Sequence, residues 1–152
     1  MKRDVVEFMS DKMSVENVAT YHKVAKTFGM PSFSKATLRC MERFFVAVAG
    51  SQNFLHLDFA LLSAILSSSK LNVTSEMEVL RVADHWVSFG GAERCKYSTR
   101  LLLKVRLPLL SNPELDQFLN ESLAFRRCET CCSLIDDVLK GKIRNKEIEP
   151  RR

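Results

Sequence analysis

The sequence contains no apolar run long enough to cross a membrane. The longest apolar stretches, such as Phe44 to Ala49 and Leu101 to Leu103, are far shorter than the roughly 20 residues that a membrane-spanning helix needs. The N-terminus also lacks an apolar region of the secretory type. These absences predict a soluble cytoplasmic protein, with the nucleus as a second compartment and no membrane partner.

Glycine and histidine are too few, and too scattered, to form the usual catalytic motifs. None of the 5 glycines stands in a Gly-x-Gly-x-x-Gly or Gly-Lys-Ser/Thr arrangement that cradles nucleotide phosphates. The 3 histidines, His22, His56 and His85, lie far apart, and none has a recognisable Cys-His or Ser-His surrounding. We expect each histidine to be exposed or half-buried on a helix. The sequence therefore predicts no enzymatic activity and no cofactor.

The 5 cysteines are an odd number and do not form a disulfide framework, which indicates reduced thiols. Cys128 and Cys131 have the Cys-x-x-Cys spacing of half a zinc site, but the other half is missing. Together with Cys132 and Ile135 they occupy positions i, i+3, i+4 and i+7 of a helix. Burial on one helix face is favoured over metal binding, redox catalysis would need a strand before the helix, and the role of the cluster stays open.

The net charge of +5 arises from basic residues that are spread along the chain, except at its end. Most of them are expected on solvated helix faces. The densest group lies in residues 140–152, after a helix-stopping glycine, and residues 141–152 are predicted to be a linker. The alternative is that the basic residues bind nucleic acid or an acidic protein.

Apolar residues recur at helical spacing along most of the chain, and no stretch shows sustained strand-like alternation. Capping residues and glycines divide the pattern into helices. We expect helices at residues 4–12, 14–28 with Ser14 as cap, 33–49, 58–66, 76–89, 93–104, 111–119 and 126–140. The predicted fold is all-α, with about seven to eight short helices stacked as antiparallel hairpins.

The segment around residues 67–89 shows how such helices are joined. Leu71-Asn72-Val73 is predicted to be an extended connector, and Ser75-x-x-Glu78 is a capping box that starts the next helix. The apolar stripe of that helix contains Trp86, which we expect in the core.

A second joint follows at residues 105–111. Pro108 interrupts the helix before it and is expected to push Leu107 toward extended geometry. Arg106 stands between two apolar residues, where its guanidinium can bind helix carbonyls or a carboxylate across the joint, or simply face solvent.

These joints have a familiar order. The stretch NFLHLDFALLSAILSSSKLNVTSEMEVLRVADHWV, followed by RLLLKVRLPLLS, closely resembles the BACK domain, the helical region between the BTB domain and the Kelch propeller of BTB-Kelch proteins. The resemblance implies the end of a BTB region at residues 1–13, a BACK domain at 14–140 and a linker toward a Kelch propeller at 141–152. It also implies that the chain is part of a longer protein.

The resemblance further implies a scaffold in a substrate adaptor of a cullin-3 RING ubiquitin ligase. In that family, BTB binds cullin-3 and dimerises, and the propeller binds the substrate. Residues 14–50 resemble the helices called the 3-box, which extend the cullin-binding surface, so Val18, Tyr21 and His22 become candidate partner-binding residues. A homodimer is expected only if the BTB domain is present. The alternative function is a free-standing basic helical module that binds nucleic acid or an acidic protein.

Overall fold

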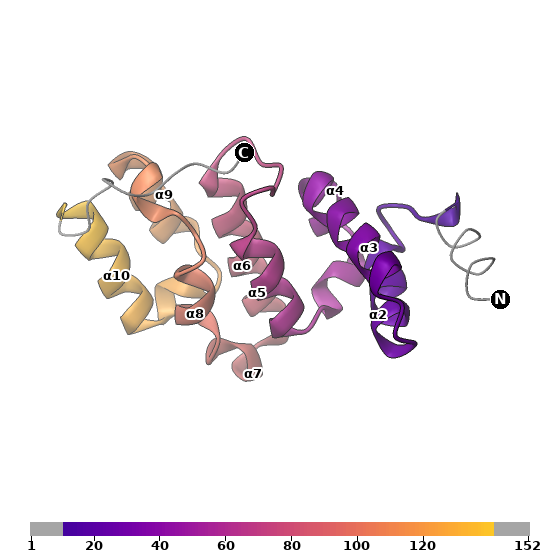
Figure 1. Cartoon of the computed structure of the whole chain (residues 1–152). Helices are drawn as coiled ribbons and strands as arrows, with labels where there is room; N and C mark the ends of the chain where they lie inside the picture. The colour runs from indigo at the N-terminus through magenta and orange to yellow at the C-terminus, as the bar shows by residue number, and fades with distance from the viewer. Residues whose placement is uncertain (1–10, 142–152) are drawn as a thin grey trace. The chain divides into compact units, whose positions relative to one another are not determined.

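The computed structural model describes residues 11–141, and within them it contains nine α-helices and no β-strand (Figure 1). In chain order the elements are α2 (Val18–Thr27), α3 (Pro31–Arg43), α4 (Phe45–Ala49), the 3₁₀ turn η1 (Gln52–His56), α5 (Phe59–Ser67), α6 (Glu76–Gly90), α7 (Ala92–Cys95), α8 (Ser98–Leu102), η2 (Leu107–Leu109), α9 (Asn112–Glu121), η3 (Phe125–Arg127) and α10 (Glu129–Leu139). The prediction of an all-α fold is confirmed. Most of the helix expected at 4–12 lies outside the described residues. None of the helices at positions 11–141 combines the length and apolar character that a bilayer-spanning helix requires.

The chain forms two compact units. The first contains the residues up to Ile65 together with Lys70–Asn72, and the second contains Leu66–Ser69 and the residues from Val73 onward. Helix α5 therefore contributes its N-terminal part to the first unit and its last residues to the second.

The first unit is built on a hairpin of α2 and α3. The turn between them contains Gly29, whose φ of 60° lies in the left-handed region that a residue without a Cβ adopts freely. Buried Ala25, Met30 and Phe33 pack where the two helices meet, and the rings of Tyr21 and Phe33 lie 6.4 Å apart. The core of the unit continues through Met41, Phe45, Val48 and Phe54, all of them almost fully buried.

The starts of both hairpin helices differ from the prediction. Ser14 does not cap with its side chain. Its amide donates to Asn17 Oδ1 at 2.6 Å and its carbonyl accepts from the Val18 amide at 2.9 Å, so a turn precedes the helix, which begins at Val18. Helix α3 begins at Pro31 rather than after Ser32, because proline fits the first turn, where its missing amide proton is not needed.

The helix predicted at 33–49 is divided at Phe44. The apolar pattern predicted a buried stripe, and its members Phe33 and Val48 are buried. Between them the buried positions are Thr37, Met41, Glu42 and Phe45, whereas Ala36 and Cys40 are half-buried and Phe44 is 47% exposed. The connector explains how the break is stabilised, because the Asn72 amide donates to the Glu42 carbonyl at 2.9 Å and its side chain donates to the Arg43 carbonyl at 3.0 Å. Carbonyls at the end of α3 thus obtain donors from a distant segment.

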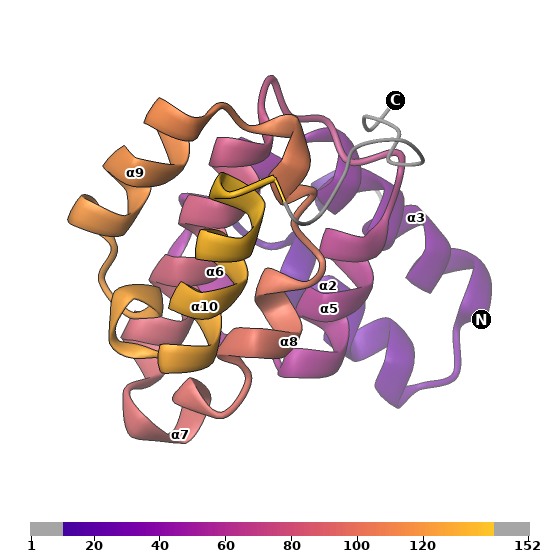
Figure 2. The same ribbon diagram turned by 90° about the vertical axis from the view of Figure 1, so that its left-hand side faces the viewer.

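The second unit is built on α6 and α10, against which its shorter elements pack. Helix α6 contacts α7 and α8, and α10 contacts α8, α9, η2 and η3 (Figure 2). The buried side chains of Leu80, Trp86, Leu101, Phe125 and Ile135 supply its core. As predicted, α6 begins at Glu76 and Ser75 caps it. The Ser75 hydroxyl accepts from the Met77 amide at 3.0 Å rather than from the Glu78 amide, and the Glu78 carboxylate binds Thr74, so the reciprocal bonds of the predicted capping box differ. The positive φ of Gly91 then closes it.

Three other boundaries in this unit differ from the prediction. The helix expected at 93–104 is two short helices, because α7 buries none of its residues whereas α8 turns Ser98, Leu101 and Leu102 into the core. Leu107 begins the 3₁₀ turn that contains Pro108, rather than lying in an extended segment. Helix α10 begins at Glu129 instead of Arg126, because the preceding residues form η3.

Candidate functional site

The first unit carries a groove of about 1070 Å³. Its walls come from α2, the N-terminal half of α3, η1 and the N-terminal part of α5. The short turn between α2 and α3 keeps these two helices together, and Leu57 and Asp58, which precede α5, also line the groove. The result is a surface made by four segments of one compact unit.

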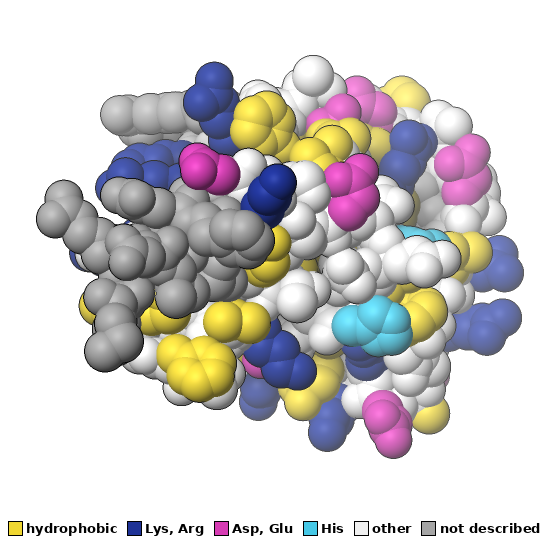
Figure 3. All heavy atoms as spheres, turned by 90° about the vertical axis from the view of Figure 1, so that its right-hand side faces the viewer, with side chains coloured by type: hydrophobic (Ala, Val, Ile, Leu, Met, Phe, Trp, Pro, Cys, Tyr) yellow, Lys and Arg dark blue, Asp and Glu magenta, His cyan; other side chains and the backbone are white. Residues whose placement is uncertain are grey.

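Apolar walls and three exposed lysines characterise this groove, whose lining also includes the exposed carboxylate of Asp58. Leu38 and Leu61 are half-buried in the walls, and Lys23, Lys26 and Lys35 are exposed among the lining residues. A groove of this kind can bury apolar side chains of a partner while the ammonium groups attract carboxylates. In the view of Figure 3, Lys and Arg side chains are distributed over the described surface rather than gathered into one patch.

The structure places the predicted partner-binding residues differently from one another. His22 lines the groove but is only 4% exposed, so the expectation of an exposed or half-buried histidine is wrong at this position. Val18 is fully buried and Tyr21 is half-buried, and neither lines the groove. His56 and His85 are exposed, as expected.

His22 is held by a polar contact that ties the two hairpin helices. Thr37 donates its hydroxyl proton to the Ser34 carbonyl at 2.8 Å, so its oxygen is the acceptor for His22 Nδ1–H at 2.7 Å. Burial and the nearby charge of Lys26 lower the pKa of His22, against the opposing effects of the Ser34 backbone and Asp58. A neutral imidazole inside the hairpin follows.

The second unit is organised by the buried carboxylate of Asp84. It accepts hydrogen bonds from the hydroxyl of Ser122 at 2.9 Å and from the amides of Leu123, Ala124 and Phe125 at 2.7, 2.9 and 2.9 Å. Four donors on one buried carboxylate fix the loop between α9 and η3 to α6. The motifs and caps of the sequence did not single out Asp84. The signal for it is a charged residue at i+4 from Leu80 and i−3 from Val87, on the buried face of the helix.

A second buried carboxylate, from α6, contacts the joint at residues 105–111. Glu76, which is 7% exposed, accepts from the Arg106 amide at 2.8 Å, and the guanidinium of Arg106 donates to the Ser69 hydroxyl at 3.2 Å. The Arg106 side chain therefore binds the hydroxyl of Ser69, and the Glu76 carboxylate across the joint binds the Arg106 backbone. Glu78, by contrast, reaches back to Thr74, whose amide and hydroxyl donate to it at 3.1 and 2.7 Å.

Trp86 is buried, as predicted, and an arginine covers it. The guanidinium carbon of Arg94 lies 3.9 Å from the centre of the Trp86 ring, and Nη1 donates to the Trp86 carbonyl at 2.9 Å. A Cβ at Gly90 would stand 2.0 Å from Arg94 Cδ, so glycine there leaves room for the arginine side chain. Burial lowers the pKa of Arg94, against the effect of Glu93.

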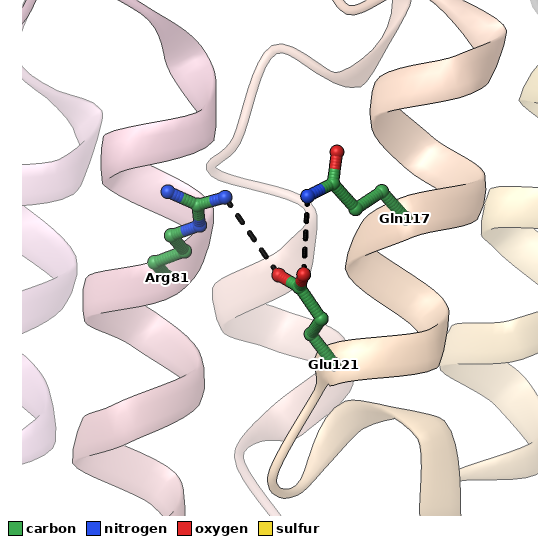
Figure 4. A network of polar contacts seen from close by, with 3 residues as sticks. All are labelled: Arg81, Gln117 and Glu121. Carbon is green, nitrogen blue, oxygen red and sulfur yellow. Dashed lines mark hydrogen bonds and ion pairs between the residues drawn. The ribbon is translucent and has the colours of Figure 1, made fainter.

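A small surface network links α6 and α9 (Figure 4). Arg81 and Glu121 lie 3.8 Å apart, and Gln117 donates to the second oxygen of Glu121 at 3.0 Å. Both charged side chains are more than half exposed, so this ion pair contributes little to stability.

No group of metal-ligating side chains forms among residues 11–141. In the cysteine cluster, Cys131 and Ile135 are buried, as expected for one helix face, whereas Cys128 and Cys132 are half-exposed. The prediction of a single buried face is thus correct for only part of the cluster.

Comparison with known proteins shows which family this helical chain belongs to. The model of the BACK family, described as BTB And C-terminal Kelch, matches residues 18–120. The chain belongs to the BACK family. Human Kelch-like protein 28 is 30% identical over 138 residues, which are 91% of this chain and 24% of that protein.

Two other relatives are consistent with this family. Zebrafish (Danio rerio) Kelch repeat and BTB domain-containing protein 12 is 27% identical over 95% of this chain and 24% of its own length. Mouse Kelch repeat and BTB domain-containing protein 3 is 27% identical over 88% of the chain and 22% of its own length. The chain thus spans less than a quarter of these relatives. The BACK assignment covers the groove helices α2, α3 and α5, and it supports a scaffold role of the adaptor type.

Proposed function

We propose that this BACK domain is the scaffold between a cullin-binding BTB domain and a substrate-binding Kelch propeller, in an adaptor of a cullin-3 RING ubiquitin ligase. In this proposal residues 1–13 end the BTB region, 14–140 are the BACK domain and 141–152 lead toward the propeller. The scaffold sets the distance between cullin and substrate in the cytoplasm and performs no chemistry itself. The family match and the names of the Kelch-like relatives support this assignment.

The observation that carries the proposal is the groove of the first unit, whose walls α2 and α3 belong to the residues that resemble the 3-box, while η1 and α5 supply the rest. An apolar segment of the cullin that also carries carboxylates fits its apolar walls and exposed lysines. Buried Val18 and His22 support this surface from inside the hairpin, and the accessible lining residues, such as Lys35, make the contact.

One lysine and one arginine on α3 provide a matched test of whether the groove binds the cullin. Lys35 lines the groove, whereas Arg39 is also exposed on α3 but does not. In a protein that carries a BTB domain upstream of this chain, Lys35→Glu should weaken binding of the cullin-3 N-terminal domain about tenfold, because charge repulsion replaces attraction at the rim. Arg39→Glu should leave the affinity within about twofold. Isothermal titration calorimetry measures both, and equal affinities for the two variants would contradict the use of this groove.

The alternative, a basic module that binds nucleic acid, predicts a different result. Its affinity for DNA or RNA would fall steeply with salt, because bound counterions are released when lysines contact phosphates. A filter-binding assay on the 152-residue chain tests this. The adaptor proposal predicts no salt-dependent retention of nucleic acid.

A further inference from the structure

The N-terminus of α10 brings two cysteine thiols and one hydroxyl group together. Cys128 is the residue before the helix, and its sulfur accepts a hydrogen bond from the Cys131 amide at 3.4 Å. The hydroxyl of Thr99, on α8, lies 3.8 Å from the Cys128 sulfur and 3.9 Å from the Cys131 sulfur. All of these residues belong to the second unit, and both cysteines lie beyond residues 18–120, which match the family.

The two thiols differ in access. Cys128 is half-exposed, whereas Cys131 is fully buried. A reagent from solution therefore reaches the first sulfur, and the second lies one helical turn further along the same face. Cys132 has a different neighbourhood, because its thiol donates to the carbonyls of Phe125 at 3.7 Å and Arg126 at 3.2 Å.

The two thiols also differ in acidity. Partial burial by itself would raise the pKa of Cys128, but hydrogen bonds from the amide and thiol of Cys131, from Thr99 and from the Thr130 backbone outweigh it, so the pKa is lowered. Burial raises the pKa of Cys131 to about 12, with the neighbouring Cys128 adding to the effect. A more acidic thiol at the accessible position and a less acidic thiol at the buried one suit a nucleophile and its resolving partner.

We propose that Cys128 and Cys131 form a peroxide-reactive dithiol that closes to a reversible disulfide at the N-terminus of α10. The geometry that supports this proposal is the position of both sulfurs at the start of one helix, each within hydrogen-bonding reach of the Thr99 hydroxyl. The dithiol is independent of the adaptor role, since it does not lie among the residues that line the groove.

The oxidation proceeds in two steps. The Cys128 thiolate attacks one oxygen of hydrogen peroxide, an S–O bond forms as the O–O bond breaks, and the released hydroxide takes up a proton to become water. Cys128 is then a sulfenic acid. The Cys131 sulfur attacks the Cys128 sulfur, the S–S bond forms, and the hydroxyl group leaves as water with the proton of the Cys131 thiol. In total, two thiols lose two electrons and two protons to one peroxide, and a thiol reductant reverses the change.

Peptide mapping tests the proposal directly. Trypsin cleaves after Arg127 and Lys140, so one peptide, residues 128–140, holds Cys128, Cys131 and Cys132 without the other cysteines. After brief treatment of the 152-residue chain with hydrogen peroxide and blocking of free thiols, this peptide should have lost two hydrogens and retain one blocked thiol. If the oxidised chain is first reduced with dithiothreitol and then blocked, the same peptide should carry three blocked thiols.

Variants assign the bond. Cys132→Ser should still lose the two hydrogens, and Cys128→Ser and Cys131→Ala should not. In Cys131→Ala the sulfenic acid at Cys128 should instead be trapped by dimedone. Serine is a good helix cap and alanine fits a buried helix position, and circular dichroism checks that both variants fold. A disulfide that persists in Cys128→Ser or Cys131→Ala, or a wild-type peptide that keeps three free thiols, would overturn the proposal.

Alkylation rates give a second reading. Iodoacetamide at neutral pH should modify Cys128 about tenfold faster than Cys40, because the thiolate reacts and burial raises the pKa of Cys40. Equal rates at Cys128 and Cys40 would show that Cys128 has no special reactivity and would overturn its assignment as the nucleophile.

Discussion

At the scale of single residues, polar groups inside the helices decide how segments meet. Asp84 stands on the face of α6 that also carries Leu80 and Val87, and all its hydrogen-bond donors come from residues 122–125. His22 plays a similar part between α2 and α3 through Thr37. In both cases a polar residue on an apolar face marks a joint rather than an error in the pattern.

Replacement of Asp84 should be among the most destabilising single changes. Asp84→Ala leaves the buried donors of Ser122 and the following amides without an acceptor, which costs about 3 kcal/mol of unfolding free energy. Urea unfolding measures the loss. The control is Asp116→Ala, an exposed carboxylate on α9 whose removal should change stability by less than about 0.5 kcal/mol. Similar losses for both would show that the Asp84 bonds do not hold the loop.

Trp86 is the 1 tryptophan of the chain, so its fluorescence reports on its surroundings. Trp86→Ala should lower the free energy of unfolding by about 3 to 5 kcal/mol, because it opens a cavity in the core of the second unit. An unchanged melting temperature would refute the core assignment. Arg94→Met should alter the emission of Trp86 while leaving the helical circular dichroism unchanged, since it removes the cation above the ring.

The buried His22 makes stability depend on pH. Its pKa is lowered in the folded state, whereas a histidine in the unfolded chain has a pKa of about 6.5. Below pH 6.5 the unfolded chain therefore binds more protons than the folded one, and the unfolding free energy falls as pH decreases toward the folded-state pKa.

The variant His22→Asn isolates this contribution. An asparagine retains a polar partner for Thr37 but does not titrate, so the loss of stability between pH 7 and pH 5 should be smaller than in the wild type. Exposed His85→Asn is the control and should keep the wild-type dependence. Urea unfolding midpoints measured between pH 7 and pH 5 compare the variants. The same pH dependence for His22→Asn and wild type would show that His22 does not cause the loss of stability.

At the scale of elements, caps could be predicted from sequence more reliably than breaks. Ser75 caps its helix as expected, and Asp58 and Ser111 cap the helices predicted to begin at 58 and 111, because a cap depends on residues only a few positions away. Ser14 is the exception. The division at Phe44 could not be predicted, since the apolar spacing continues through it. Its stabilising donors come from Asn72, and no local pattern reports a partner so distant in sequence.

The connector that holds this break can be tested. Asn72→Ala removes the side-chain donor to the Arg43 carbonyl and should cost about 1 kcal/mol, because the carbonyl at the end of α3 must then rely on water. The exposed Asn120→Ala on α9 serves as control, with an expected change within about 0.5 kcal/mol. Thermal unfolding followed by circular dichroism compares the two, and equal melting temperatures would mean that the connector does not stabilise α3.

At the scale of the whole molecule, the motifs of residues 54–111 predicted the family, because capped joints leave a readable order in sequence. The groove of the first unit was harder to predict. It depends on how α2, α3, η1 and α5 pack, and its lysines look like ordinary solvated residues until the helices are placed together. The burial of Val18 and His22, two of the predicted contact residues, has the same origin.

The central claim is that this BACK domain forms only part of a cullin-binding surface whose other part is the BTB domain. Loss of half of the buried area weakens binding steeply, because the entropic cost of association stays while the offsetting contacts are lost. Calorimetric titration of the cullin-3 N-terminal domain into the 152-residue chain, and into a protein that carries a BTB domain upstream of it, measures this most directly. The account predicts no detectable heat of binding with the chain alone and clear binding with the longer protein. Nanomolar binding by the chain alone, or none by the longer protein, would contradict it.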